Sequence, residues 1–179
     1  MLNIDRVVVG DYQTNCYILS IGQDCLVIDP GDEYDKIKSC ISNKNVLAIL
    51  LTHRHFDHIG ALDLVSSYGN LKIYEYNNVK QEEYKIGPFN FKVIYTSGHT
   101  EDSITYYFET EKIMFTGDFL FENSIGRTDL PTGDYNEMLK SIELIKKYDD
   151  DIIIYPGHGN ETKLGIEKIN NIWFDNVNS

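Results

Sequence analysis

Short apolar runs recur along the whole chain and predict β-strands. They are rich in β-branched and aromatic residues, and turn-forming residues such as Gly, Asp, Asn and Pro bound most of them. The predicted strands cover residues 7–9, 17–19, 26–28, 46–51, 71–74, 91–95, 104–108, 113–115 and 152–155. Runs that are apolar throughout are typical of strands covered on both faces of their sheet.

Helical patterns lie between some of these runs. The clearest follows Asp134, where apolar residues recur at intervals of three and four positions up to Tyr148. Asp134 and Glu137 have the spacing of a capping box, in which a carboxylate satisfies free backbone N–H groups at the start of the helix. Weaker helical patterns cover residues 34–41, 59–68 and 164–173. Strands with helices between them predict sheets covered by helices, which is an α/β (α+β layered) fold.

Length and composition are those of one globular domain. The 179 residues fit the usual size of a domain and no linker divides them, so we predict one domain over residues 1–179. The chain has 28 acidic and 16 basic residues, which gives a net charge of −12. Nucleic-acid affinity comes mainly from clustered Lys and Arg, so this charge argues against a nucleic-acid partner.

Neither membrane insertion nor export is expected. The longest strongly apolar run, residues 46–51, is much shorter than the roughly 20 residues of a transmembrane helix, and the N-terminus lacks the pattern of a secretory signal. The three cysteines form no CxxC pair, so we expect them to be small apolar core residues rather than disulfides or thiolate ligands. We therefore expect a cytoplasmic protein without a membrane partner.

Three of the five histidines fall within six residues, in the pattern His-x-His-x-Asp-His. Residues two apart on an extended backbone point to the same side, so His53 and His55 can reach one metal ion. Asp57 and His58 lie where the next helix is expected to begin, and they could hold a second ion or complete the first site from the side. Alone, Asp57 would more often be a helix N-cap and each histidine an ordinary residue, but the four together indicate a metal site.

The other two histidines and one aspartate each follow a predicted strand in a turn that contains glycine. They are His99 in Ser-Gly-His-Thr, Asp118 in Thr-Gly-Asp and His158 in Pro-Gly-His-Gly. A glycine beside a ligand lets the backbone approach closely. Asp118 alone would also suit an ordinary turn. Five imidazoles and two carboxylates make a nitrogen and oxygen donor set suited to Zn²⁺, Fe or Mn²⁺.

The order of these motifs resembles the metallo-β-lactamase superfamily. The resemblance extends from Asn15 to Gly159 and implies an αββα sandwich with the metal ions at one edge, between the two sheets. Asp29, in Val-Ile-Asp-Pro-Gly, is similar to an earlier aspartate of the family that is usually structural or supports the ligands. Residues 117–121 and 124–131 resemble the short glyoxalase II-like hydrolases.

This resemblance also implies which residue binds which ion. His53, His55 and His99 would bind one ion, Asp57, His58 and His158 the other, and Asp118 would bridge the two. The cofactors would be two divalent ions, most often Zn²⁺, with Fe or Mn²⁺ as alternatives. An aspartate instead of a cysteine at position 118 argues against the common zinc β-lactamases, and the lack of a long inserted domain argues against the nuclease branches.

The function implied is metal-dependent hydrolysis of a small-molecule acyl thioester of the hydroxyacylglutathione type. A hydroxide that bridges the two ions would attack the thioester carbonyl, and Asp57, the expected catalytic residue, would bind the second ion and orient the hydroxide. Glyoxalase II enzymes hold glutathione with a C-terminal helical region. About twenty residues follow His158 here, so we expect the contact with glutathione to differ.

Three other functions fit parts of the pattern. A persulfide dioxygenase would hold a single iron with His53, His99 and Asp118, although Leu130-Pro131 after the arginine of the loop favours the hydrolase. A phosphodiesterase could use the same metal pair. The third alternative is a non-enzymatic module stabilised by metal ions. Structural zinc sites usually have four protein ligands, whereas seven candidates for two ions leave positions for water, which favours catalysis.

Arg127 is the candidate for substrate binding outside the ligand set. A loop arginine can hold a substrate carboxylate through two parallel hydrogen bonds. Asp129 lies two positions away, however, and the interpretation that we favour is a local ion pair that fixes the loop.

Overall fold

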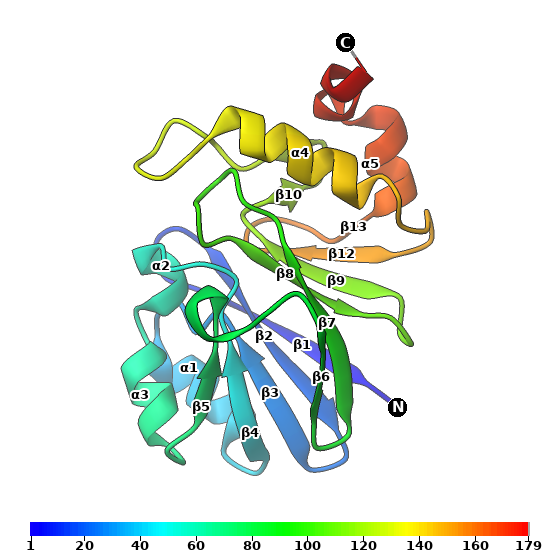
Figure 1. Cartoon of the computed structure of the whole chain (residues 1–179). Helices are drawn as coiled ribbons and strands as arrows, with labels where there is room; N and C mark the ends of the chain where they lie inside the picture. Colours follow the sequence, from blue (N-terminus) through cyan, green and yellow to red (C-terminus); the bar gives the residue numbers. More distant parts are fainter. Residues whose placement is uncertain (179) are drawn as a thin grey trace.

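Two β-sheets pack face to face in the computed structural model, which describes residues 1–178 (Figure 1). The first sheet has the order β1-β2-β3-β4-β5 and the second the order β13-β12-β9-β8-β7-β6. The first sheet contains β1 (Asn3–Val9), β2 (Thr14–Ile21), β3 (Asp24–Ile28), β4 (Asn45–Leu50) and β5 (Lys72–Tyr74). The second contains β6 (Glu83–Ile86), β7 (Phe89–Tyr95), β8 (Ile104–Phe108), β9 (Ile113–Gly117), β12 (Ile153–Pro156) and β13 (Thr162–Lys163). A small hairpin consists of β10 (Leu120–Phe121) and β11 (Ser124–Ile125).

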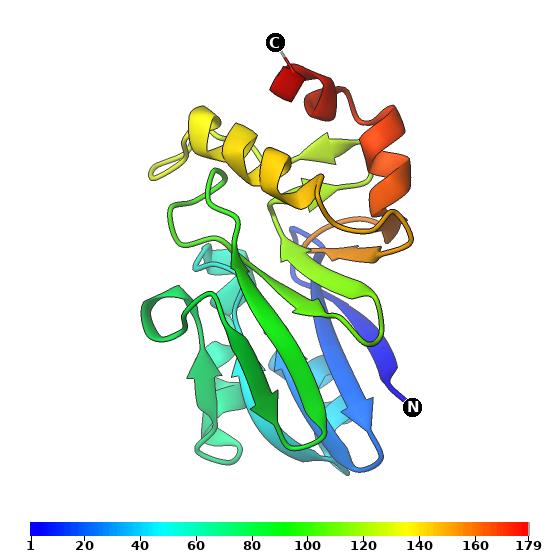
Figure 2. The same ribbon diagram turned by 45° about the vertical axis from the view of Figure 1, so that its right-hand side comes forward.

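Helices cover the outer face of each sheet. Those on the side of the first sheet are α1 (Tyr34–Ile41), α2 (Phe56–Ile59) and α3 (Leu62–Ser67). Those on the side of the second are α4 (Tyr135–Ile145) and α5 (Leu164–Asn170), and two 3₁₀ helices, η1 (Tyr76–Asn78) and η2 (Ile172–Asn178), complete the fold. The rotated view shows the same separation, with α4 and α5 beyond the second sheet (Figure 2). The αββα sandwich is therefore confirmed.

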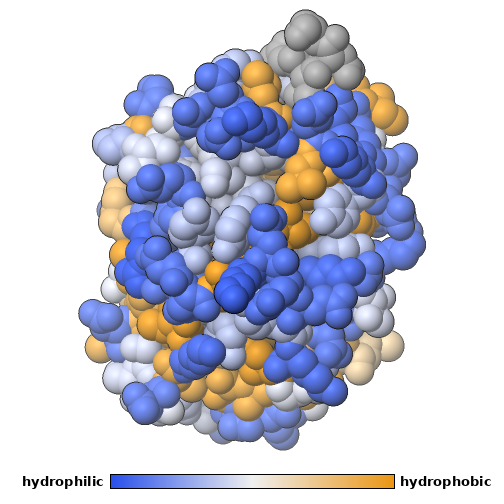
Figure 3. All heavy atoms as spheres, in the orientation of Figure 1, coloured by the Kyte–Doolittle hydropathy of each residue, from blue (hydrophilic) through white to orange (hydrophobic). Residues whose placement is uncertain are grey.

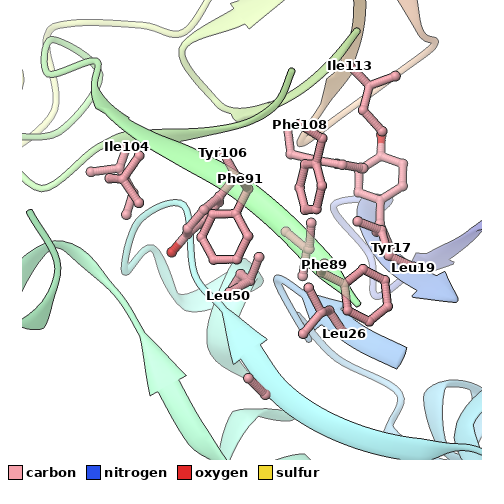
Figure 4. Close-up of a cluster of buried hydrophobic side chains, with 14 of the residues drawn as sticks. Tyr17, Leu19, Leu26, Leu50, Phe89, Phe91, Ile104, Tyr106, Phe108 and Ile113 are labelled. Carbon is pink, nitrogen blue, oxygen red and sulfur yellow. The ribbon is translucent and has the colours of Figure 1, made fainter. Parts of the chain in front are cut away.

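Three apolar layers hold the sandwich together, and strand β2 shows how one strand serves two of them. Tyr17 and Leu19 point into the core between the sheets (Figure 4), whereas Cys16 and Ile18 point toward α1 and α3. This alternation follows from the two-residue period of a strand. Because both faces are covered, the strand reads as a continuous apolar run. The third layer packs α4 against the outer face of the second sheet, with Met138 fully buried.

The three cysteines lie in the apolar core or against it. Cys16 and Cys25 are buried in the apolar layer beneath α1, Cys40 packs against it, and all three are free thiols, as predicted.

Hydrophilic side chains dominate the face shown in Figure 3, with small apolar patches between them. Among the described helices, none has the length and apolarity needed to cross a lipid bilayer.

The structure differs from the predicted helices in two places. The helix predicted over 59–68 is replaced by the end of α2 at Ile59 and by α3, which begins at Leu62. A Cβ at Gly60 would lie 2.3 Å from the carbonyl oxygen of Gly31, and Ala61 N donates to Pro30 O. The backbone therefore packs against the preceding turn where the helices separate. The helix predicted over 164–173 ends at Asn170, and a 3₁₀ helix follows.

The start of α4 is capped as predicted, but only from one side. Asp134 Oδ1 accepts hydrogen bonds from Asn136 N at 2.7 Å and Glu137 N at 3.1 Å. The Glu137 carboxylate pairs instead with Lys140 Nζ at 2.7 Å, where a capping box would return it to the backbone of Asp134.

Candidate metal centre

The predicted ligands lie where strands end at one edge of the sandwich. His53 follows β4 and His99 follows β7, while Asp118 and His158 directly follow the neighbouring strands β9 and β12. The carboxyl ends of β9 and β12 meet at the same edge because these two strands run parallel. Asp57 and His58 lie on α2, next to this edge in Figure 1. Its N-cap residue is His55, so the alternative reading of Asp57 as the helix N-cap is wrong.

Four of the seven residues form what we call the first ligand group: His53, His55, His99 and Asp118. His55 Nδ1 lies 3.2 Å from His53 Nε2 and 2.9 Å from His99 Nε2. His99 Nε2 in turn lies 3.5 Å from Asp118 Oδ2. His53 and His99 are buried, with 2% and 3% of their surface exposed.

The other three residues form the second ligand group: Asp57, His58 and His158. Asp57 Oδ2 lies 3.2 Å from His158 Nε2 and 3.6 Å from His58 Nε2. Asp118 also faces this group, since its Oδ1 is 3.2 Å from His58 Nε2 and its Oδ2 is 3.4 Å from His158 Nε2. The structure thus brings all seven predicted ligands together, with Asp118 between the two groups.

These separations fit metal coordination. Corners of a tetrahedron of ligands about 2.0–2.1 Å from zinc lie about 3.3–3.4 Å apart, close to the separations within both groups. Two of the atoms, His58 Nε2 and Asp118 Oδ1, are buried and make no hydrogen bond with any described residue. Buried polar atoms without a partner are costly. Metal ions would relieve that cost, so the residues fit a pair of divalent ions.

Most of the imidazoles are oriented through their second ring nitrogen. His99 Nδ1 lies 2.8 Å from the carbonyl oxygen of Arg127, and His158 Nδ1 lies 3.0 Å from that of Tyr12. His58 Nδ1 lies 3.0 Å from Asp29 Oδ2. A carbonyl or carboxylate accepts a hydrogen bond from the N–H of the nitrogen that faces it. In the neutral ring, the opposite Nε2 therefore carries the lone pair that can bind an ion.

Asp29 supports both groups from a buried position. Its Oδ2 accepts a hydrogen bond from Thr52 Oγ1 at 2.6 Å, and that hydroxyl lies 3.1 Å from His53 Nδ1. The same carboxylate oxygen faces His58 Nδ1. Asp29 therefore connects one imidazole of each group, the supporting position that the family resemblance implies for it.

The carboxylates and imidazoles shift one another's pKa. Burial opposes charge on His58, yet the Asp118 and Asp29 carboxylates raise the pKa of His58 to about 10. Burial opposes charge on His158 too, but hydrogen bonds to Asp118 and Asp57 raise the pKa of His158 to about 9. Despite their burial, Asp57 and Asp118 have pKa values below the usual range because imidazoles face them. The ionised carboxylates thus require positive charge, from protons or from metal ions.

Close approach of the backbone explains one of the glycines beside a ligand. A Cβ on Gly157 would lie 2.3 Å from Asp118 Oδ1 and 2.7 Å from His58 Cε1. No larger residue fits there unless the ligands move.

A cavity of about 410 Å³ opens onto both ligand groups. Apart from the ligands, its walls are mainly apolar, with Tyr12, Phe56, Phe121 and Leu130. The rings of Tyr12 and Phe56 meet edge to face with centroids 5.1 Å apart, and both side chains are more than 60% exposed. A second cavity of about 570 Å³ shares His55, Phe56 and Leu130 with the first. The ligands therefore lie at the base of a cleft wide enough for a small molecule.

Arg127 lies in the wall of the smaller cavity and pairs with its neighbour in the loop. Its Nε and a terminal nitrogen donate to the two oxygens of Asp129 at 2.7 and 2.8 Å. Both side chains are more than half exposed. This is the local ion pair that we favoured from the sequence, and the carbonyl oxygen of Arg127, rather than its guanidinium, contacts His99.

Three residues of the site were not among the sequence candidates. Thr14 Oγ1 donates to Asp57 Oδ2 at 2.8 Å, Thr52 lies between Asp29 and His53, and Tyr12 accepts from His158. Thr52 directly precedes the histidine cluster, and this position is a signal that could have identified it. Tyr12 and Thr14 carry no comparable signal, since they lie more than 40 positions from the residues that they contact.

Comparisons of the sequence with known proteins show its family. The family model of the metallo-β-lactamase superfamily matches residues 9–82 and 77–158. The probable metallo-hydrolase YqgX of Bacillus subtilis is 35% identical, over 93% of this chain and 94% of that protein. The hydroxyacylglutathione hydrolase GloC of Haemophilus influenzae is 32% identical, over 95% and 97% of the two chains.

Solved structures are similar over nearly the whole fold. BLEG-1, a B3 metallo-β-lactamase, has a TM-score of 0.90 and 31% identity, with 94% of this chain and 98% of that chain covered. TTHA1623 in a di-iron-bound form has a TM-score of 0.87, 28% identity and coverage of 93% and 98%. ETHE1 from Myxococcus xanthus has a TM-score of 0.87, 25% identity and coverage of 94% and 83%. The chain therefore belongs to the metallo-β-lactamase superfamily.

Proposed function

We propose that this protein is a hydrolase that binds two divalent metal ions and cleaves acyl thioesters of the hydroxyacylglutathione type. The observation that carries the proposal is the place of Asp118, whose two oxygens face both ligand groups beneath an open cavity. The shared Asp118 gives each ion four protein ligands, and the open cavity above them leaves room for a water molecule as a further ligand. The similarity to the hydroxyacylglutathione hydrolase GloC supports the thioester as substrate.

Bound metal ions would supply Lewis acidity, which lowers the pKa of water to about 7 and polarises a carbonyl oxygen. The residues of the chain position this chemistry. Asp57 would bind the second ion and hold the attacking water through its carboxylate. Asp29 and Thr52 fix the histidine rings through their second nitrogens, so the ligands need not reorganise during the reaction. The thiol product leaves as its thiolate and needs no protein acid.

The walls of the cleft would hold the two halves of the thioester. Tyr12 and Phe56 form an exposed aromatic edge beside the ligands, which suits an apolar acyl or thiol segment and reduces the water around the carbonyl. Arg127 is committed to Asp129, so a contact with a substrate carboxylate would require this ion pair to open. We therefore give Arg127 a minor part in binding.

The metal in the cell is also part of the proposal. Nitrogen and oxygen donors without thiolates suit zinc, and iron and manganese fit the same ligands. We propose Zn²⁺ first, and the di-iron form of TTHA1623 keeps iron as the alternative.

A persulfide dioxygenase with a single iron is the second candidate, and the similarity to ETHE1 favours it. His53, His99 and Asp118 would then form a facial set of two histidines and one carboxylate. The complete second ligand group favours the hydrolase, because a single iron would leave that group without an ion.

The test is an assay of purified protein loaded with Zn²⁺, Mn²⁺ or Fe²⁺ in turn. S-lactoylglutathione, simpler acyl thioesters, a β-lactam and a glutathione persulfide with oxygen form the substrate panel. We expect thiol release from at least one thioester, with the Asp57→Asn variant as a control of much lower activity. Oxygen consumption with the persulfide and no thiol release from any thioester would replace the proposal by the dioxygenase.

A further inference from the structure

The start of strand β2 contacts the second ligand group through a buried hydroxyl. Thr14, 1% exposed, donates from Oγ1 to Asp57 Oδ2 at 2.8 Å. This oxygen is the one that faces His158 Nε2 and His58 Nε2, at 3.2 and 3.6 Å. A carboxylate oxygen has two lone pairs, so it can accept from Thr14 and still bind an ion. The hydrogen bond from Thr14 thus fixes the rotamer of Asp57 and determines which of its two oxygens faces the second ligand group.

The same segment also holds the turn that carries His158. Thr14 pairs with His158 as an isolated antiparallel bridge, and Asn15 N donates to Gly157 O at 2.7 Å. Asn15, also 1% exposed, donates from Nδ2 to the carbonyl oxygens of Pro156 and Gly159, both at 3.0 Å. His158 Nδ1 faces the carbonyl oxygen of Tyr12. Residues 12–15 therefore fix two of the three members of the second group.

The first ligand group has no such attachment. Within the described residues, no hydrogen bond joins residues 12–15 to His53, His55 or His99. His53 takes its orientation from Thr52 instead, and His99 from the carbonyl of Arg127. A change at the start of β2 should therefore reach one group and not the other.

We infer that Thr14 is a positioning residue that sets the affinity of the second metal ion without affecting the first. The inference rests on the metal pair of the proposed function. Without the hydroxyl, the Asp57 carboxylate is free to rotate. The entropy lost when it is ordered then reduces the binding free energy of the second ion. Loss of a residue that orients a metal ligand typically weakens the metal about 10- to 100-fold.

The experiment is a titration of the metal-free protein with metal ions. Calorimetry monitors the binding of Zn²⁺, and the absorption bands monitor the binding of Co²⁺. Thr14→Val keeps the shape of the side chain and removes its hydroxyl, whereas Thr14→Ser keeps the hydroxyl. We expect Thr14→Val to bind the first ion as the wild type does and the second about 10- to 100-fold more weakly. Thr14→Ser should restore the second affinity to within about threefold.

A matched control comes from β13, an edge strand of the second sheet. Thr162 is also buried, and its hydroxyl also donates to a carboxylate, Glu167 Oε1, at 2.7 Å. Thr162→Val should leave both metal affinities unchanged, and circular dichroism with thermal unfolding checks that each variant folds.

Wild-type affinity for both ions in Thr14→Val, or equal weakening of both in a folded variant, would overturn the inference. So would a wild-type protein that binds a single ion. If the wild type binds two ions but cleaves no thioester, the metal titration still decides the role of Thr14 and only the proposed substrate is lost.

Discussion

The two ligand groups are built in different ways. In the first, His53 and His55 come from the loop between β4 and α2, and their ring nitrogens lie 3.2 Å apart. In the second, Asp57 and His58 come from a helix of four residues and His158 from a turn a hundred positions later. His58 is fully buried, but the side chain of His158 is 28% exposed. Both groups also include residues from distant segments, His99 and Asp118 in the first and His158 in the second, but only the second takes its distant imidazole from a partly exposed turn.

This difference indicates how the metal ions should bind. A metal ion must displace protons from imidazoles with a raised pKa, such as His58 and His158, but not from those with a lowered pKa, such as His53. We therefore expect the first group to bind its ion more tightly and the second to determine when the pair is complete. The predictions below test this contrast, from the largest expected effect to the smallest.

Removal of Asp118, which faces both ligand groups, should prevent either group from holding its ion. In Asp118→Ala, each group loses the carboxylate that faces it, so we expect loss of both ions after dialysis and about a 1,000-fold fall in thioester hydrolysis. Metal content by mass spectrometry and thiol release check this. Asp129→Asn, a charge loss in the nearby loop, is the control that should keep both ions. Retention of two ions by Asp118→Ala would refute the bridging place of this residue.

Asp57→Asn should affect one group only. The amide keeps the size of the side chain but removes the negative charge that faces His158 and His58. We expect the first ion to remain, the second to bind about 100-fold more weakly and turnover to fall by a similar factor, with the thermal unfolding midpoint of the metal-free protein little changed. An unchanged rate would instead support ions with a purely structural role.

Protons should distinguish the two groups during metal binding. The pKa values of His58, about 10, and His158, about 9, mean that both imidazoles hold a proton at pH 7.5 in the metal-free protein. Burial instead lowers the pKa of His53 and His55. Metal ions bind only unprotonated imidazoles, so about one to two protons should be released with the second ion and about none with the first. Calorimetry in two buffers of different ionisation enthalpy measures this number, and release with the first ion would contradict the assignment.

The same pKa values predict how the stability of the metal-free protein depends on pH. A histidine whose pKa is raised on folding stabilises the fold fully below its ordinary value near 6.5. This contribution is lost as the pH rises through about 9 for His158 and about 10 for His58. The free energy of unfolding of the metal-free protein should therefore fall between pH 6.5 and pH 10. Denaturant titrations at several pH values check this, and a rise over that range would contradict it.

The smallest effect is expected at Arg127. Its carbonyl oxygen orients His99, while its exposed guanidinium pairs only with Asp129 within its loop. Arg127→Ala should keep both ions and change kcat/KM less than about tenfold, because an ion pair exposed to solvent contributes little. A loss of the first ion, or a much larger rise in KM, would assign the guanidinium a direct role in the site.

Much of the fold could be predicted from the sequence because each sheet is covered on both faces. That arrangement makes strands such as β4 and β8 continuous apolar runs, which stand out against polar turns. The two-residue strands β10 and β13 were missed, since two residues give no readable period. The break at Gly60 was missed because it depends on contact with the turn at Gly31, which a helical period does not report.

The site, too, has residues that could be predicted from the sequence and residues that could not. All seven ligand candidates could be found because histidine is rare in the chain and each motif follows an apolar strand. Thr14 could not, because its role exists only where β2 meets the end of β12, more than 140 positions along the chain. Chemistry carried by rare residues is visible in a sequence, whereas the contacts that orient these residues depend on the tertiary structure.

The most direct test of the central claim is to count metal ions and assay thioester cleavage on the same protein sample. Mass spectrometry would give the ions per chain, and a thiol reagent would follow S-lactoylglutathione and simpler thioesters. We predict two ions per chain and thiol release that falls as the second ion is removed. One ion per chain with full activity, or two ions with no thiol released from any thioester, would contradict the account.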